Sequence, residues 1–226
     1  MKRSILLEKA ETPDGKRLEL FEHDGRYVIR VDGVELMSTR RHASEERLAE
    51  LVCAGFSKQK GIRVLVGGLG FGFTLRAALA QLAPDAKVVV SELMPQVVEW
   101  NRKPEYKLGA DVLADPRVRV VEEDVAKIID RERGTFDGIM LDVDNGPGGF
   151  TTDFNDRLYE EMGLYRIQGA QKPGGVVGFW SASADPLFVK RLTRAGYEVD
   201  VQRARAHSTS GGWHTLFMAK APATPR

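Results

Sequence analysis

Five short apolar runs that alternate with helix-compatible segments constrain the fold of this chain more than any other feature. The runs span residues 63–67, 87–91, 118–121, 136–141 and 176–180. Because parallel strands need crossover connections and are covered on both faces, this alternation predicts a doubly wound, mostly parallel sheet. Two later strand-like runs, 196–205 and 212–220, have no helix between them and predict an antiparallel pair. We therefore expect an α/β, Rossmann-like sheet of seven strands with an antiparallel C-terminal strand.

The N-terminal part follows a different rhythm. Residues 17–37 alternate apolar and polar positions, with Asp-Gly pairs at 24–25 and 32–33, which predicts a small antiparallel β-meander. A helical pattern of Leu48, Leu51, Val52 and Phe56 follows, and Ser44 precedes it as a candidate N-cap. The expected organisation is an N-terminal β-meander module (1–40), a Rossmann-like domain (41–220) and a frayed tail (221–226).

Composition excludes several classes of function. The 226 residues include 33 Lys and Arg against 32 Asp and Glu, and the basic residues form no block, so a nucleic-acid partner is not expected. A single cysteine, Cys53, rules out an internal disulfide and fits a reducing compartment. The four histidines have no metal-ligand spacing, and no segment is apolar and long enough to span a membrane. We expect a soluble, cytoplasmic protein without a metal.

A glycine-rich turn follows the first strand of the predicted sheet. Gly68, Gly70 and Gly72 alternate directly after the apolar run 64–66, at the edge where open α/β sheets bind ligands. The spacing is GxGxG, and Phe73 stands where a dinucleotide-binding loop needs its third glycine. The loop therefore disfavours a nicotinamide or flavin cofactor.

Two acids follow the next two strands. Glu92 ends the run 87–91, where a carboxylate can accept hydrogen bonds from both hydroxyls of a ribose, or is simply a surface acid. Asp124 ends the run 118–121 and opens a helix, where it is an N-cap, an acceptor for an adenine amino group, or both. Together with the loop, these acids are typical of a nucleoside site.

The loop and the two acids resemble the S-adenosylmethionine-binding fold of class I methyltransferases, and one branch fits better. Six segments resemble, in order and spacing, successive motifs of the spermidine synthase (polyamine aminopropyltransferase) family: "VLVGGLGFGFTLR", "SELMPQVVEW", "DPRVRVVEEDV", "FDGIMLDVDNGPG", "YRIQGAQKPGG" and "STSGGWHTLFMAK". The resemblance runs from about Leu18 to Lys220, the meander and its helix included, with "DPRV" as its most specific piece.

The resemblance implies an adenosyl sulfonium cofactor, decarboxylated S-adenosylmethionine or S-adenosylmethionine, with Glu92 on the ribose and Asp124 on the adenine. The expected cofactor-binding residues are Gly68, Gly70, Gly72, Glu92, Asp124 and Val125. It also implies a small-molecule amine as substrate and a possible homodimer.

The chain departs from the family at the glycine loop. The family's loop carries an aspartate that receives the amine of the aminopropyl arm, and this position is Phe71 here. A phenyl ring cannot replace a carboxylate there, although cation–π attraction of about 0.5–2 kcal/mol is a partial substitute.

A second departure concerns the predicted catalytic loop. Where the family has two acids three residues apart before a proline, this chain has Asp142, Val143, Asp144 and Asn145, so that Asn145 replaces the second acid or the acid has moved to Asp144. In an extended strand end Asp142 and Asp144 face the same side. Two carboxylates suit a cationic amine, and Asp142 is our candidate for the base that takes the proton of the attacking nitrogen. The alternative is a turn-forming role for Asp142 in a stretch rich in Asn, Gly and Pro.

Two further positions bear on the substrate. The family's Tyr-His-Glu triplet corresponds to residues 44–46, Ser-Glu-Glu, in which Glu46 is expected either to keep the acidic member or to lie on a solvated helix face. Trp213 follows "SGG" where the family places an aromatic beside the pocket, although a core position is the simpler interpretation. Phe71, Asn145 and Trp213 are thus the expected substrate-binding residues.

Three functional hypotheses remain open at this point. The first is a spermidine-synthase-like transferase that moves an aminopropyl or related group from an adenosyl sulfonium to an amine. The second is an S-adenosylmethionine-dependent methyltransferase acting on a small molecule, and the third is a non-catalytic nucleoside-binding homologue. The acceptor is not predicted, because the positions that would select it are those that depart from the family.

Overall fold

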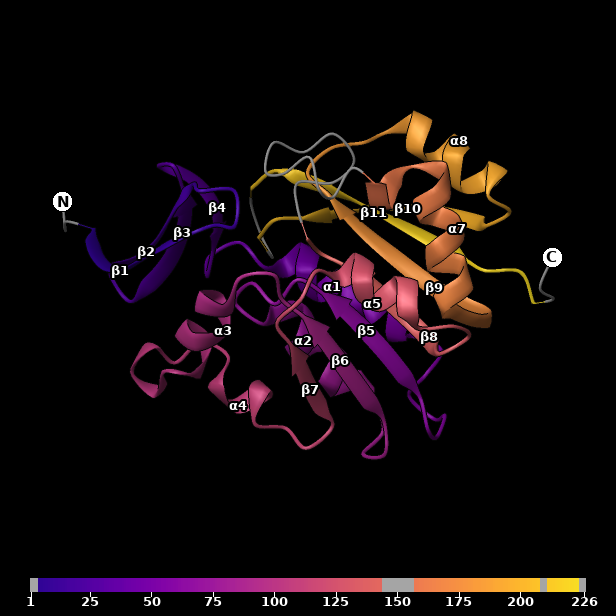
Figure 1. Ribbon diagram of the computed structural model, residues 1–226, viewed down its shortest axis with the longest axis horizontal. Coiled ribbons are helices and arrows are strands. Elements are labelled where there is room, and N and C mark those ends of the chain that lie inside the picture. The colour runs from indigo at the N-terminus through magenta and orange to yellow at the C-terminus, as the bar shows by residue number, and fades with distance from the viewer. Residues whose placement is uncertain (1–3, 144–156, 208–210, 224–226) are drawn as a thin grey trace.

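The structure of the chain is a computed structural model that describes residues 4–143, 157–207 and 211–223 (Figure 1). The strands are β1 (Ile5–Glu11), β2 (Arg17–His23), β3 (Arg26–Val31), β4 (Val34–Ser38), β5 (Arg63–Gly67), β6 (Lys87–Ser91), β7 (Val118–Val121), β8 (Phe136–Leu141), β9 (Gln171–Ser181), β10 (Glu198–Arg205) and β11 (Trp213–Lys220). The helices are α1 (Ala43–Cys53), α2 (Phe73–Gln81), α3 (Pro95–Arg102), η1 (Pro104–Tyr106), α4 (Ala110–Leu113), α5 (Val125–Arg131), α7 (Glu161–Ala170) and α8 (Pro186–Arg194). Among the described residues, no helix is both long and apolar enough to cross a membrane.

The larger sheet has seven strands in the order β10-β11-β9-β8-β5-β6-β7. All neighbours from β9 to β7 pair in parallel, and β11 runs antiparallel to both β9 and β10. The predicted fold class is confirmed. From β5 the chain first winds outward through β6 and β7 and then returns to β8, so a crevice opens at the carboxyl ends of β5 and β8.

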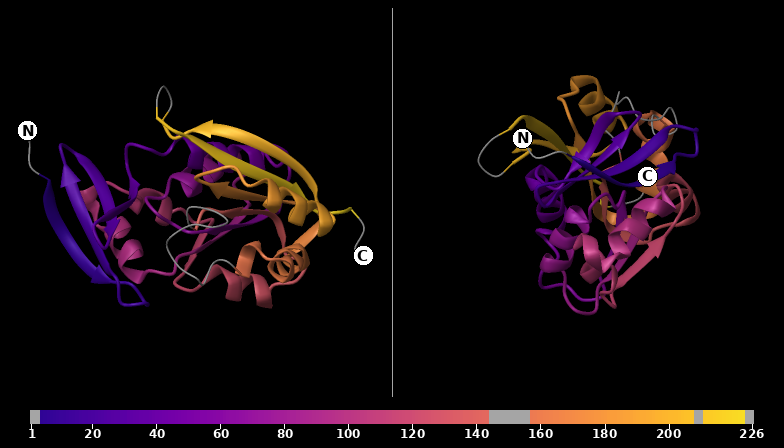
Figure 2. Two further views of the ribbon diagram at one scale, coloured as in Figure 1. Left: turned by 90° about the horizontal axis from the view of Figure 1, so that it is seen from above. Right: turned by 90° about the vertical axis from the view of Figure 1, so that its left-hand side faces the viewer.

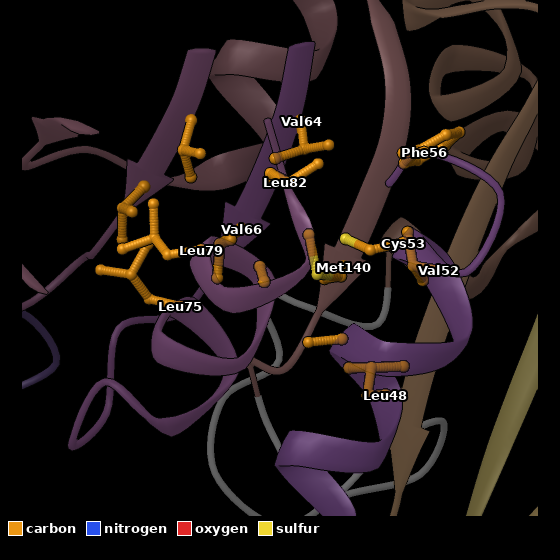
Figure 3. Close-up of a cluster of buried hydrophobic side chains, with 14 of the residues drawn as sticks. Leu48, Val52, Cys53, Phe56, Val64, Val66, Leu75, Leu79, Leu82 and Met140 are labelled. Carbon is orange, nitrogen blue, oxygen red and sulfur yellow. The ribbon is translucent and has the colours of Figure 1, made fainter. Parts of the chain in front are cut away.

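Apolar side chains alternate between the two faces of this sheet. On β5, Val64 and Val66 contribute to one cluster with α1 and α2, whereas Leu65 contributes to another with α5, α7 and α8. Figure 3 shows the first cluster, in which Leu48 and Val52 of α1 lie beside the strands. Each cluster is almost completely buried, which fixes the helices on both faces of the sheet.

Helix α1 lies unusually close to the sheet. A Cβ on Gly178 of β9 would approach side-chain atoms of Leu48 and Val52 to 2.7 Å each. A larger residue at this position would have to displace both side chains, so the glycine allows α1 to pack this close to β9. The close packing brings the first turn of α1 to the carboxyl ends of β5 and β8.

The N-terminal sheet has four antiparallel strands in sequence order, one more than the predicted meander. The additional strand, β1, pairs with β2 through a register irregularity between Leu6 and Glu8, and such a break weakens the alternation that reveals a strand. Figures 1 and 2 show this sheet at one end of the molecule, near α3. Leu18, Leu20 and Ile29 pack there against residues of α3 and the glycine loop, so this sheet closes one side of the crevice.

Candidate functional site

Two adjoining cavities occupy the crevice at the carboxyl edge of the larger sheet. The first cavity, of about 130 Å³, reaches from the glycine loop to the ends of β6 and β7. The second cavity, of about 300 Å³, reaches from the glycine loop to α1, β9 and β11. They share five lining residues, namely Leu36, Met37, Gly70, Asp142 and Val143. A molecule that fills the first cavity therefore meets a molecule in the second beside Asp142.

The glycine loop has a backbone that other residues could not easily adopt. Gly68, Gly70 and Gly72 have φ values of +88°, +52° and +80°. A Cβ on Gly68 would lie 2.2 Å from the carbonyl oxygen of Asp142, so the loop also lies against the end of β8. Gly68 and Gly70 line the first cavity, whereas Gly72 is the N-cap of α2 in the left-handed conformation. The glycines thus serve both the cavity and the turn.

Phe71 does not point into either cavity. Its side chain is 4% exposed and packs in the cluster formed by the N-terminal sheet and α3, which includes Leu20, Ile29 and Trp100. The expectation of a substrate contact therefore needs correction: the ring secures the N-terminal sheet to the glycine loop. In the sequence, Phe71 lies midway between the apolar residues Leu69 and Phe73, which is compatible with a core position. That its ring is buried becomes evident only from the position of the N-terminal sheet.

Glu92 is fixed in the first cavity by the backbone. It is 8% exposed, and its two carboxylate oxygens accept hydrogen bonds of 2.9 Å from the N–H groups of Leu69 and Met94. Burial raises the pKa of Glu92, while these backbone donors oppose the rise. These hydrogen bonds fix the carboxylate in the lining of the first cavity, where it can accept hydrogen bonds from a diol.

Asp124 has two partners in the structure. One oxygen accepts a hydrogen bond of 2.8 Å from the N–H of Ala126, which makes Asp124 the N-cap of α5. The other oxygen pairs with the guanidinium of Arg157. Asp124 and Val125 both line the first cavity, beside Glu92. The N-cap interpretation of Asp124 is therefore correct, and a nucleobase amino group would share the second oxygen with Arg157.

Asp142 lies at the junction of the two cavities and faces a second acid. Its Oδ2 accepts a hydrogen bond of 2.7 Å from the hydroxyl of Thr74. Burial raises the pKa of Asp142 to about 6, and the Thr74 hydroxyl opposes the rise. The pKa of Glu45 is raised well above its ordinary value, first by burial and then by the charge of Asp142. Glu45 and Asp142 therefore form a half-buried pair of interacting carboxyl groups at the second cavity.

Sequence reasoning missed Glu45 as a site residue. Of the two interpretations of Glu46, the solvated helix face agrees with the structure, because Glu46 pairs with His42 one turn earlier, is partly exposed and lines neither cavity. Adjacent glutamates on a helix cannot be told apart by residue type. Which of the two faces the cavity depends on how α1 is turned about its axis where it packs against Gly178, and this is set by tertiary structure.

Ser44 is also not the helix cap that the sequence suggested. The N-cap of α1 is His42, and Ser44 is 1% exposed inside the first turn. Its hydroxyl accepts a hydrogen bond of 3.0 Å from the indole N–H of Trp180 and lies 2.8 Å from Nδ1 of His214. Trp180 and His214 line the second cavity together with Glu45.

Trp213 requires a further correction. Its side chain is 46% exposed, lies against the guanidinium groups of Arg203 and Arg205, and lines neither cavity. Successive residues of a strand point to opposite faces, and on β11 it is His214, not Trp213, that faces the second cavity. The predicted Asp144 and Asn145 lie outside the described residues. Within the described ranges, no group of three or more His, Cys, Asp or Glu side chains is arranged to hold a metal ion.

The comparisons with known proteins agree with this geometry. No family model matches the chain. It is 28% identical over 183 residues to the polyamine aminopropyltransferase of Leptospira biflexa serovar Patoc, which covers 77% of this chain and 61% of that protein. A second relative, polyamine aminopropyltransferase 2 of Pseudomonas aeruginosa, is 30% identical over 120 residues, 50% of this chain and 32% of its own length. The chain thus spans less than two thirds of the length of these curated relatives.

Solved structures show the same fold. Spermidine synthase from Thermotoga maritima matches with a TM-score of 0.74 and 21% identity, over 97% of this chain and 74% of that one. A spermidine synthase in complex with the transition-state analogue AdoDATO matches with a TM-score of 0.73 and 20% identity, over 97% and 73% of the two chains. In sequence the chain is similar to polyamine aminopropyltransferases, and in fold it is similar to spermidine synthases.

Proposed function

We propose that this chain is an aminopropyltransferase-like enzyme, which moves an aminopropyl or related group from an adenosyl sulfonium co-substrate to a small amine. The observation that carries the proposal is the position of Asp142, where a cavity with the fixed carboxylates Glu92 and Asp124 meets a cavity with the half-buried acid Glu45. The names of the relatives support the same activity.

The residues of the first cavity fit an adenosyl group. Glu92 presents lone pairs on two oxygens that backbone N–H groups already orient, as a vicinal diol requires. The backbone N–H of Val125 stands at the first position of α5, beside the Asp124 carboxylate, so the two offer a donor and an acceptor to the edge of an adenine. Gly68 and Gly70 leave room for the sulfonium portion above the loop.

The second cavity suits the amine. An alkylammonium must lose a proton before its nitrogen can attack, and Asp142 is positioned to accept it. A C–N bond then forms as the C–S bond breaks, and the electron pair of the broken bond remains on sulfur, which becomes a neutral thioether. The raised pKa of Asp142, about 6, makes it a stronger base than an exposed aspartate while it is still ionised above neutral pH. Thr74 already donates to Oδ2, so Oδ1 keeps more acceptor capacity for the proton of the amine.

Turnover of the Asp142→Asn variant tests this proposal. Wild-type protein is incubated with decarboxylated S-adenosylmethionine and a panel of amines, and release of methylthioadenosine is measured. We expect Asp142→Asn to lose at least about a hundredfold in rate, the lower range for general base catalysis, while its affinity for methylthioadenosine stays within about twofold. Thr74→Val is the matched variant, since it removes the partner of Asp142 but keeps the carboxylate. Full activity of Asp142→Asn would refute Asp142 as the base.

A methyltransferase using intact S-adenosylmethionine is the second candidate, and the position of Phe71 favours it. The glycine loop has no carboxylate at position 71, and the ring of Phe71 is part of the apolar core. Calorimetry with both sulfonium compounds separates the two candidates, because preference for the decarboxylated form supports the transferase and preference for S-adenosylmethionine the methyltransferase. A homodimer and a cytoplasmic location stay part of the proposal, and light scattering tests the first.

A further inference from the structure

Two pairs of interacting side chains line the second cavity, and we call them its acidic side and its far side. On one side lie the carboxyl groups of Glu45 and Asp142, which suit an ammonium group. On the other side lie His214 and Arg41, and the positive charge of Arg41 is close enough to His214 to contribute to the lowering of the histidine's pKa. The far side of the cavity therefore does not repeat the acidic side.

The hydrogen bonds of Ser44 determine which nitrogen of His214 carries the proton. The indole N–H of Trp180 can only donate, so the Ser44 oxygen accepts from it. The Ser44 oxygen could also accept from an Nδ1–H, but its own hydrogen would then have no partner among the described residues, so we assign the hydroxyl as the donor and Nδ1 of His214 as the acceptor. A histidine that accepts at Nδ1 carries its proton on Nε2 when neutral. Burial, followed by the charge of Arg41, lowers the pKa of His214 and keeps the ring neutral.

The imidazole of His214 thus presents a hydrogen-bond donor to the second cavity. Because Nδ1 is bound to Ser44 inside α1, the cavity meets His214 through its Nε2–H side. The Arg41 guanidinium lines the same side and uses one nitrogen on Glu35, so further N–H groups remain for a ligand. Glu35 is the only acid on this side among the lining residues, and Arg41 already neutralises it.

We infer that the acceptor substrate is an amine that carries a hydrogen-bond-accepting oxygen group, a hydroxyl or a carboxylate, at the end opposite its reacting nitrogen, rather than a second ammonium. The reacting amine lies toward Glu45 and Asp142, and the oxygen group lies toward His214 and Arg41. This inference rests on the proposed function for the direction of the amine, but the ranking of ligands does not require turnover.

Binding of three amines with the same four-carbon chain tests the inference. Protein saturated with methylthioadenosine is titrated by calorimetry at pH 8 with 4-aminobutan-1-ol, 4-aminobutanoate and 1,4-diaminobutane. We expect the better oxygen-bearing amine to bind roughly three- to tenfold more tightly than the diamine, the range expected for one hydrogen bond. Equal or tighter binding of the diamine, or no binding of any amine, would overturn the inference. The proposed function fails separately, if no amine accepts a group from the co-substrate.

Variants connect the preference to the residues. His214→Phe keeps a ring against Trp180 but removes the N–H donor, and it is expected to abolish the preference. His23→Phe, the same change at the exposed last residue of β2, should leave it intact. Arg41→Gln distinguishes a carboxylate from a hydroxyl, since losing the guanidinium charge should reduce the affinity for 4-aminobutanoate more than the affinity for 4-aminobutan-1-ol. An unchanged ranking in His214→Phe would contradict the assignment. Nitrogen NMR of the wild-type protein provides a test that needs no variant, because an Nδ1–H tautomer of His214 would also contradict it.

Discussion

Replacing Gly68 by alanine tests whether the glycine loop positions Asp142 as well as the ligand. The new Cβ would lie 2.2 Å from the carbonyl oxygen of Asp142 and 3.0 Å from its carbonyl carbon, and both are backbone atoms that no rotamer change can move. The backbone at Gly68 has φ +88°, which costs an alanine about 1–2 kcal/mol. Relieving the overlap adds about 1–3 kcal/mol, the usual range for overpacking.

The Gly68→Ala variant should therefore lose about 2–5 kcal/mol of unfolding free energy, the sum of strain and overlap. Gly33→Ala is the matched control, since Gly33 has φ +83° but no atom within 4 Å of the added Cβ. It carries the strain alone and should lose no more than about 1–2 kcal/mol. Urea unfolding of both variants, with the slope of the transition compared, measures the difference.

The same displacement should reach the site. Because Gly68 contacts the end of β8, relief of the overlap moves the Asp142 backbone, and turnover should fall more than nucleoside affinity. If Gly68→Ala and Gly33→Ala lost the same unfolding free energy, the close approach between the loop and β8 would contribute nothing to stability. The contact would then not be what positions Asp142.

Three further predictions concern single side chains. The folded protein holds the proton of Asp142 with a pKa of about 6 instead of the ordinary 3.8, so its contribution to stability is greatest at low pH and is lost as the pH rises from about 4 to 6. Urea unfolding across this range should show that wild type loses stability relative to Asp142→Asn; parallel pH profiles would contradict the burial of this carboxyl group. Glu92→Gln places an amide NH₂ against the N–H of Leu69 or Met94. Calorimetry with methylthioadenosine should show at least about a tenfold loss of affinity. Unchanged binding would exclude Glu92 from the nucleoside site. Phe71→Ala should cost about 3–5 kcal/mol in urea unfolding, as for other buried phenylalanines, and a loss below about 1 kcal/mol would show that the ring is not part of the core.

The sequence was sufficient to predict the larger sheet in detail. The runs at 63–67 and 87–91 coincide with β5 and β6, because a strand buried on both faces is apolar throughout and glycine or acidic residues end it. The positions of Glu92 and Asp124 followed from the same reasoning, since the carboxyl ends of parallel strands share one edge. Local pattern and tertiary position coincide in this half of the site.

The second cavity could not be predicted in the same way. Its residues come from β4, the glycine loop, the end of β8, α1, β9 and β11. These elements are distant in sequence and meet only in the folded chain. The pattern of α1 predicts which face of the helix is apolar. It does not predict that the first turn borders a cavity, so from the sequence Ser44 is interpreted as an N-cap. On β11 the alternation fixed that Trp213 and His214 face opposite sides, but not which side holds the cavity.

Charge balance in the second cavity follows from these tertiary contacts. Arg41 pairs with Glu35, and Glu45 and Asp142 are close enough to raise the pKa of Glu45, so ionisation of one acid disfavours that of the other. When the pair holds one proton, it carries a single negative charge, which one ammonium group neutralises. A second ammonium at the far side would meet the guanidinium of Arg41 rather than a free carboxylate. Electrostatics and the donor assignment of His214 therefore favour the same class of substrate, although they depend on different residues.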